Sequence, residues 1–205
     1  MKKPVENQKE EAPFSHYAGL FRNLNPAEAL DRLPSAAFDG NRFTLTLLGR
    51  TYAIAWPEYA IVPQDGGPVP NLPTQTFLLR CLLEAKELPW QGQWKTFREM
   101  PWGELYIQPF TGRCLQRAAF GFGNRLPAFR AACEKLGAKP LAHGDAGYEF
   151  PFLGPYAMEI LLWAGDEEFP PSAQLLYTEN FAQGFAPEDR VVAGDILINH
   201  IKSAM

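Results

Sequence analysis

The sequence predicts an α+β fold, a single domain in which antiparallel strands of an N-terminal and a C-terminal hairpin pack with about four to five helices. Stretches that alternate apolar and polar residues occur as neighbouring pairs near the beginning and the end of the chain, and such pairs form antiparallel hairpins. Other stretches carry apolar residues at every third or fourth position, the spacing of an amphipathic helix. Because the strands are not regularly interleaved with helices, the pattern indicates α+β architecture.

The first third of the chain begins with a helical pattern over residues 16–33, in which Pro26 follows the capping residue Asn25. Residues 43–48 and 51–56 are predicted strands joined by a tight turn at Gly49-Arg50. Residues 59–62 are expected to add a short third strand.

The middle of the chain is predicted to be helical. A pattern over residues 74–88 ends at Pro89, and residues 90–106 are expected to be irregular or short-stranded. A second helix starts at residue 107 or 111 and runs to residue 120. A third spans 126–136, with Gly137 at the left-handed position after its end.

The last third is predicted to be rich in strands, at residues 147–150, 157–163 and 173–178. The last two form a hairpin whose loop is an acidic run. A closing helix begins at Pro187, with acidic residues in its first turn that suit the helix dipole, and ends near residue 202.

Composition limits the class of protein. The chain has 205 residues, a net charge of −4 and three cysteines. An odd number of cysteines with no close pair argues against a disulfide framework or a zinc knuckle. No stretch approaches the length of a membrane span, and the N-terminus lacks the apolar segment of a signal peptide. We therefore expect a cytoplasmic protein that binds no membrane, with residues 1–13 as a flexible tail and residues 14–205 as one domain.

The acidic run Asp166-Glu167-Glu168 is the first candidate site. It lies between a strand that ends at Trp163 and the segment Phe169-Pro170-Pro171. Three adjacent carboxylates suit a hard cation or a cationic partner. The competing interpretation is structural: Asp166 accepts backbone hydrogen bonds, Phe169 anchors the loop in the core and the prolines fix its exit.

A second cluster contains His143 and Asp145, which precede the strand at 147–150. A His-x-Asp pair can ligate a metal or act as a general base with its orienting group. The same residues also suit a glycine-rich turn that enters a strand. A functional role gains support if this turn meets the acidic run in space.

Basic and aromatic residues form a third group. Arg113 and Arg117 are four positions apart and share a helical face, and tryptophans lie earlier in the chain. Such a group can bind an anionic planar ligand or single-stranded nucleic acid. The acidic net charge and the absence of an RNA-binding motif argue against nucleic acid, and core packing with surface solvation is the alternative.

The run WAGDEEFPPSAQLLYTENFAQGFAPEDRVVAGDIL resembles the closing signature of an uncharacterised bacterial and archaeal domain family of anaerobes. Further similar segments are FTLTLLGRTYAI, TFLLRCLLEAKELPWQGQWKTFREMPWGELY and LGAKPLAHGDAGYEFPFLG. Relatives stand alone or are fused to ferredoxin-like iron–sulfur modules. The resemblance implies a setting accessory to anaerobic redox or corrinoid metabolism, and it supplies no catalytic residues.

Three functional hypotheses follow. The first is a non-catalytic module that binds a protein partner or a small ligand, without a cofactor or a bound metal, through the acidic loop and the turn beside it. The alternative is a metal-dependent hydrolytic enzyme that uses the acidic loop together with His143 and Asp145. A third possibility is a structural partner in a redox complex.

Overall fold

The computed structural model describes residues 8–205, with Gln8 described by its backbone alone. These residues form helices and two antiparallel sheets, which confirms the α+β class. They divide into two compact units, one up to Lys86 and one from Glu87 onward. The expectation of one domain over residues 14–205 stays a prediction. Of the expected tail, residues 1–7 lie outside the described residues, and residues 8–13 belong to a helix.

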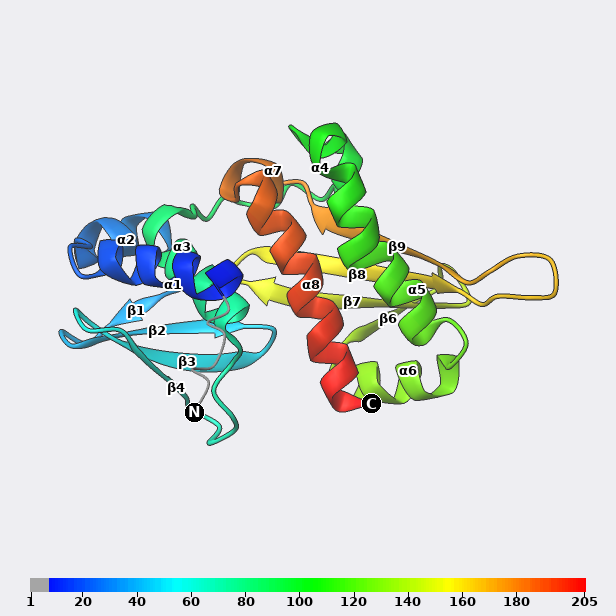
Figure 1. Cartoon of the computed structure of the whole chain (residues 1–205), viewed down its shortest axis with the longest axis horizontal. Coiled ribbons are helices and arrows are strands. Elements are labelled where there is room, and N and C mark those ends of the chain that lie inside the picture. The colour runs from blue at the N-terminus through cyan, green and yellow to red at the C-terminus, as the bar shows by residue number, and fades with distance from the viewer. Residues whose placement is uncertain (1–7) are drawn as a thin grey trace, which may run out of the picture. The chain divides into compact units, whose positions relative to one another are not determined.

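The sheet of the first unit has the strand order β1-β2-β3-β4, with every neighbouring pair antiparallel (Figure 1). The predicted hairpin is confirmed as β2 (Arg42–Leu47) and β3 (Arg50–Ala55), and the short third strand as β4 (Ala60–Pro63). Strand β1 (Ala37–Phe38) was not predicted, because it is two residues long and carries no alternation.

Three helices accompany this sheet. The predicted helix over residues 16–33 is two helices, α1 (Gln8–Phe21) and α2 (Pro26–Arg32), separated at the Asn25 cap, whose side chain accepts a hydrogen bond from the backbone N–H of Ala27. The third, α3 (Leu72–Glu84), starts two residues before the predicted position because Asn71 caps it by accepting from the backbone N–H of Thr74.

The sheet of the second unit has the order β5-β9-β8-β7-β6, again antiparallel throughout. The predicted C-terminal hairpin is confirmed. The strand bounds, in chain order, are β5 (Trp94–Thr96), β6 (Lys139–Leu141), β7 (Ala146–Leu153), β8 (Tyr156–Trp163) and β9 (Ser172–Thr178). Nearly every side chain of β8 is buried, which places this strand at the centre of the unit's core.

The helices of the second unit lie over this sheet, with α8 and the run from α4 to α5 in front of it in Figure 1. Their bounds are α4 (Gly103–Phe110), the π-helical segment η2 (Thr111–Gln116), α5 (Arg117–Phe122), α6 (Leu126–Lys135), α7 (Phe181–Gly184) and α8 (Pro187–Ala204); a 3-10 turn, η1 (Phe97–Glu99), follows β5. The predicted helices at 126–136 and 187–202 are confirmed.

The helix expected from residue 107 or 111 starts earlier, at Gly103. Trp102 before it adopts a left-handed conformation with a φ of 65°, which turns the chain into the helix. At Gly103 a Cβ atom would lie 2.2 Å from the backbone oxygen of Phe97. Only glycine permits this close approach between the start of α4 and η1.

All three cysteines are buried and none forms a disulfide. Cys81, Cys114 and Cys133 are each at most 1% exposed. Burial raises the pKa of both the Cys114 and the Cys133 thiol to about 12, so these two groups stay protonated at neutral pH. Within residues 8–205, none of the helices has the length and apolar character that a membrane crossing requires.

Candidate functional site

The turn that contains Asp145 lies beside the acidic loop, which connects β8 to β9. The backbone N–H of Asp145 donates to the carbonyl oxygen of Leu162 at 2.9 Å. Its carboxylate oxygen Oδ2 accepts a hydrogen bond from the backbone N–H of Ala164 at 2.8 Å. Gly144 makes this approach possible, because it has a φ of 71° and a Cβ there would lie 2.8 Å from the Leu162 oxygen. The two candidate segments are therefore neighbours in space.

Asp166 orders the acidic loop from within. Its Oδ1 atom accepts hydrogen bonds from the backbone N–H groups of Phe169 at 2.7 Å and Glu168 at 2.9 Å. Its own backbone N–H donates to the Phe169 carbonyl at 2.9 Å. These contacts, the one from Phe169 first, hold the pKa of Asp166 below its usual value because they stabilise the charged carboxylate. Asp166 thus has the structural role that one interpretation gave it.

The exit of the loop is set by Pro171. A Cβ atom on Gly165 would lie 2.7 Å from Pro171 Cδ, and one on Gly123 would lie 2.5 Å from Pro171 Cβ. The proline ring therefore packs against both the start of the loop and the residue after α5. Phe169 does not anchor the loop in the core, as the structural interpretation assumed, because its side chain is 66% exposed. The hydrogen bonds of Asp166 and the packing of Pro171 provide the order instead.

Two carboxylates and two aromatic rings of this loop and the adjoining end of β8 are accessible to solvent. Glu167 and Glu168 are exposed, and within residues 8–205 neither carboxylate has a hydrogen-bond or ion-pair partner. Trp163 and Phe169 are 39% and 66% exposed. Figure 1 shows the loop projecting beyond the ends of β8 and β9. We call these four exposed residues the loop tip: Trp163, which pairs with Ser172 where the loop begins, and Glu167, Glu168 and Phe169 within the loop.

His143 is exposed in the turn before Asp145. Its charge contributes to the environment of the buried Glu159 on β8, whose pKa is raised chiefly by burial and secondly by Glu149, with His143 opposing the rise. Nothing among the described residues joins the His143 side chain to Asp166. In the described part of the chain, no three His, Cys, Asp or Glu side chains are grouped so that they could hold a metal ion.

Arg113 and Arg117 share one face, as their spacing predicted, and this face meets α8. Arg113 forms an ion pair with Glu188 at 3.1 Å. Arg117 is paired with Asp195 and donates to Oδ1 of Asn199 at 2.7 Å. The guanidinium groups therefore connect η2 and α5 to the last helix of the same unit. Their proposed contact with a ligand or partner stays a prediction.

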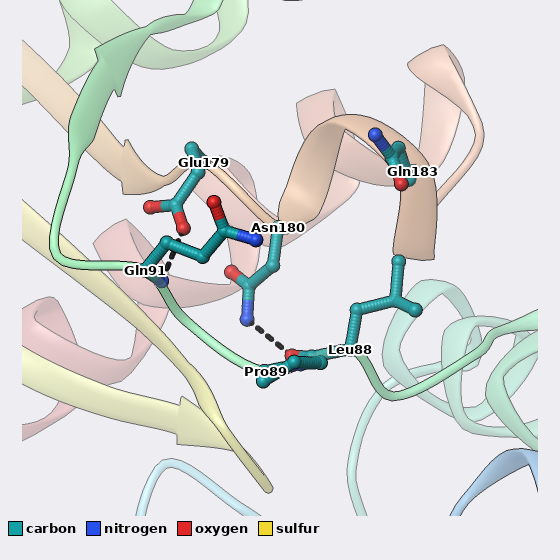
Figure 2. A pocket seen from close by; sticks show the side chains of 6 residues that line it. All are labelled: Leu88, Pro89, Gln91, Glu179, Asn180 and Gln183. Carbon is teal, nitrogen blue, oxygen red and sulfur yellow. Dashed lines mark hydrogen bonds between the residues drawn. The ribbon is translucent and has the colours of Figure 1, made fainter.

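A pocket that the sequence analysis missed lies at the end of β9 remote from the loop tip. It has a volume of about 330 Å³ and is lined by Leu88, Pro89, Gln91, Glu179, Asn180 and Gln183 (Figure 2). The only sequence signal for it is the pair Glu179-Asn180 directly after a predicted strand. That signal is weak, because the other lining residues come from a segment predicted to be irregular.

Comparison with known proteins identifies the family to which the chain belongs. No curated protein and no solved structure matches the chain. The family model described as Domain of unknown function (DUF3786) matches residues 25–200, and so extends over most of both units. This match confirms that the chain resembles an uncharacterised domain family, whereas the acidic signature, the occurrence in anaerobes and the iron–sulfur neighbours stay predictions. The chain belongs to the DUF3786 family.

Proposed function

We propose that the protein is a non-catalytic binding module and that the loop tip recognises a cationic segment of a protein partner. The proposal rests on a difference between the carboxylates in and beside the loop: two order the loop, and two are exposed. Asp145 and Asp166 accept backbone hydrogen bonds that order the loop. Glu167 and Glu168 are left exposed and unpaired within residues 8–205. A rigid loop that displays two carboxylates is suited to lysine or arginine side chains.

The aromatic rings at the loop tip support the same partner class. Trp163 is 39% exposed and Phe169 is 66% exposed, and the faces of such rings attract ammonium and guanidinium groups. Exposed ion pairs contribute at most about 1 kcal/mol each. The contact is therefore expected to be weak, and its affinity should fall as salt is raised.

A cytoplasmic setting accessory to anaerobic redox or corrinoid metabolism also belongs to this proposal. That part rests on the family resemblance alone. Nucleic acid is not a proposed partner, because the loop tip carries negative charge and would repel phosphates.

The experiment uses a fluorescent peptide of alternating lysine and alanine as the probe and measures its anisotropy with the full chain at low salt. Glu167→Gln/Glu168→Gln is expected to weaken binding about tenfold, since two exposed ion pairs of this kind together supply about 1.4 kcal/mol. This variant keeps Asp166, so the loop keeps its order. Trp163→Ala and Phe169→Ala should each weaken binding as well.

Glu10→Gln/Glu11→Gln is the matched control, because these adjacent exposed acids lie on α1 and their removal changes the net charge equally. An affinity that falls equally in both double variants would mean that only the net charge matters. An unchanged affinity in Glu167→Gln/Glu168→Gln would show that the loop tip is not the recognition surface.

The metal-dependent hydrolytic alternative makes a different prediction. Under it, Mn²⁺ or Mg²⁺ raises the melting temperature of the protein, and Glu167→Gln/Glu168→Gln removes that rise. Under the binding proposal, these ions leave the melting temperature of both proteins unchanged.

A further inference from the structure

The pocket at the end of β9 contains a buried polar group whose hydrogen-bonding capacity is only half used. Asn180 is 5% exposed. Its side-chain nitrogen Nδ2 donates to the carbonyl oxygen of Leu88 at 2.8 Å and to that of Pro155 at 3.4 Å. Both neighbours are acceptors, so the nitrogen must face them and the orientation of the amide is fixed.

The amide oxygen Oδ1 of Asn180 consequently faces the other way, and none of the described residues forms a hydrogen bond with it. Figure 2 shows this oxygen directed away from the Leu88 contact, on the side where the Gln91 side chain lies. Buried side-chain acceptors are nearly always satisfied in native proteins. An acceptor left open in a residue that lines a pocket indicates that a donor arrives from outside the described chain.

Glu179 gives the pocket its charge. The backbone N–H of Gln91 donates to one carboxylate oxygen, and that of Gln93 donates to the other at 3.1 Å. The backbone N–H of Glu179 in turn donates to the Gln93 carbonyl at 3.1 Å. These bonds hold the carboxylate in place, yet each of its oxygens can accept a further hydrogen bond.

Among the described residues, no cationic side chain lines the pocket beside this carboxylate. Glu179 is the only charged residue that lines the pocket, and it forms no ion pair within the described part of the chain. The remaining lining consists of two glutamines, Asn180 and the apolar side chains of Leu88 and Pro89. The pocket therefore combines acceptors, one negative charge and a short apolar wall.

We propose that this pocket binds a small organic cation that carries N–H donors, namely a primary ammonium or a guanidinium group on a short apolar chain. The cationic group donates to Oδ1 of Asn180 and to the carboxylate of Glu179, while the apolar chain contacts Leu88 and Pro89. Because Oδ1 is itself covered, the exposed side chain of Gln91 moves aside to admit the ligand. The volume of about 330 Å³ is at the small end for ligand pockets.

This site is independent of the loop tip. The pocket follows Thr178 at the end of β9, whereas the loop tip precedes Ser172 at its beginning. Seven residues of strand span roughly 20 Å, so one small ligand does not reach both. The two proposals can therefore fail separately.

The first test is a titration of the ¹⁵N-labelled full chain with propylammonium and, separately, methylguanidinium, followed by amide chemical shifts. Saturable shifts are expected at Gln91, Glu179 and Asn180, including the side-chain amide of Asn180. Propanol and propionate have similar sizes and lack the cationic donor, so they should cause no such shifts. The absence of saturable shifts, or equal shifts with propionate, would overturn the proposal.

Variants separate the proposed contacts. Glu179→Gln removes the charge and should weaken propylammonium binding about tenfold or more, as expected for a lost charge-assisted hydrogen bond. Glu10→Gln, which removes one exposed carboxylate on α1 outside both proposed sites, is the matched control and should leave the affinity unchanged. Equal losses in both variants would contradict a defined site, and the amide spectrum of each variant reports whether it is folded.

Gln91→Ala tests the competing possibility that the Gln91 amide is itself the natural donor to Asn180. If the pocket takes an external cation, this truncation opens access and preserves or strengthens binding. Loss of binding in Gln91→Ala would count against the proposal. The lysine–alanine peptide is titrated in the same way. Chemical shift changes around Asn180 with the small cations but not with the peptide would support a small-molecule ligand. Such changes with the peptide alone would overturn the proposal.

Discussion

The carboxylate of Asp145 and the backbone N–H of Ala164 form a hydrogen bond of 2.8 Å, which joins the turn before β7 to the loop after β8. These residues are far apart in the sequence and belong to the two predicted site clusters. The contact makes Asp145 part of the support for the acidic loop. A change at residue 145 should therefore act on the loop.

We predict that Asp145→Ala loosens the loop. Removing the carboxylate leaves the Ala164 N–H to be hydrated by water, and an exposed hydrogen bond to a carboxylate contributes about 1–2 kcal/mol. Hydrogen exchange followed by NMR should show faster exchange at Ala164, with a smaller effect at Glu168 and Phe169. Asp145→Asn keeps an oxygen acceptor and should retain most of the protection. Unchanged exchange at Ala164 in Asp145→Ala would refute the structural role of this carboxylate.

The sequence predicted the parts of the fold whose signals are local. The hairpins follow from strict alternation around a tight turn, and α8 follows from Pro187 with acids in its first turn. The helix break at Asn25 was marked by the cap, but the continuous apolar pattern hid the separation of α1 from α2. Short edge strands such as β1 are too brief to show alternation, because their backbone pairing and not their side chains defines them.

The candidate sites show the same difference between local sequence signals and contacts that arise only in the folded chain. The acidic loop was predicted because its residues are adjacent, and the alternative that Asp166 is structural could be stated from its residue type alone. Asn180 could not be recognised in this way. Its importance arises from carbonyl groups at Leu88 and Pro155, which only the folded chain brings to it. Equally, spacing placed Arg113 and Arg117 on one face but could not reveal that α8 supplies their partners.

The next prediction concerns how acid pH affects the contribution of Asp65 to the stability of the first unit. Arg50 binds both oxygens of Asp65, Nε to Oδ2 at 2.7 Å and Nη2 to Oδ1 at 3.0 Å, and the Gly67 N–H donates to Oδ1 at 2.9 Å. The hydrogen bond from Arg50, followed by that from Gly67, lowers the pKa of Asp65 to about 2. A carboxyl group with a lowered pKa stabilises the folded state above its unfolded pKa, and this contribution disappears as the pH falls through the folded value.

The stabilisation by Asp65 should therefore be complete above about pH 4 and lost towards pH 2. NMR titration of the Asp65 carboxyl carbon measures its pKa directly, and the Gly67 amide should move with the same midpoint. In Asp65→Asn, the pH dependence of the Gly67 amide over this range should vanish. A measured pKa near the usual aspartate value would contradict the two-point contact with Arg50.

The last prediction concerns Arg190 on α8, which is 1% exposed. Its Nε and Nη1 atoms have no hydrogen-bond partner within residues 8–205. Burial lowers the pKa of its guanidinium, with Tyr177 and then Asp189 opposing that effect. A buried charge with unmet donors costs stability, and replacing a buried ionic group together with its counter-charge by neutral side chains is often neutral or stabilising. Asp189 is 5% exposed, so Arg190→Met alone would leave a buried carboxylate without this cation. We expect Arg190→Met/Asp189→Asn, which removes both charges, to raise the free energy of unfolding by about 1–3 kcal/mol.

Guanidinium denaturation followed by tryptophan fluorescence is suited to this test, because Trp90, Trp94, Trp102 and Trp163 all lie in the unit that contains Arg190. Arg190→Lys keeps a cation and should give no gain, which separates charge from side-chain length. Arg190→Ala should be less stable than Arg190→Met, because it leaves a cavity. If Arg190→Met/Asp189→Asn is instead less stable than the wild type, the guanidinium and its counter-charge make a net favourable contribution, and the open donors of Arg190 are then best explained by a buried water or anion.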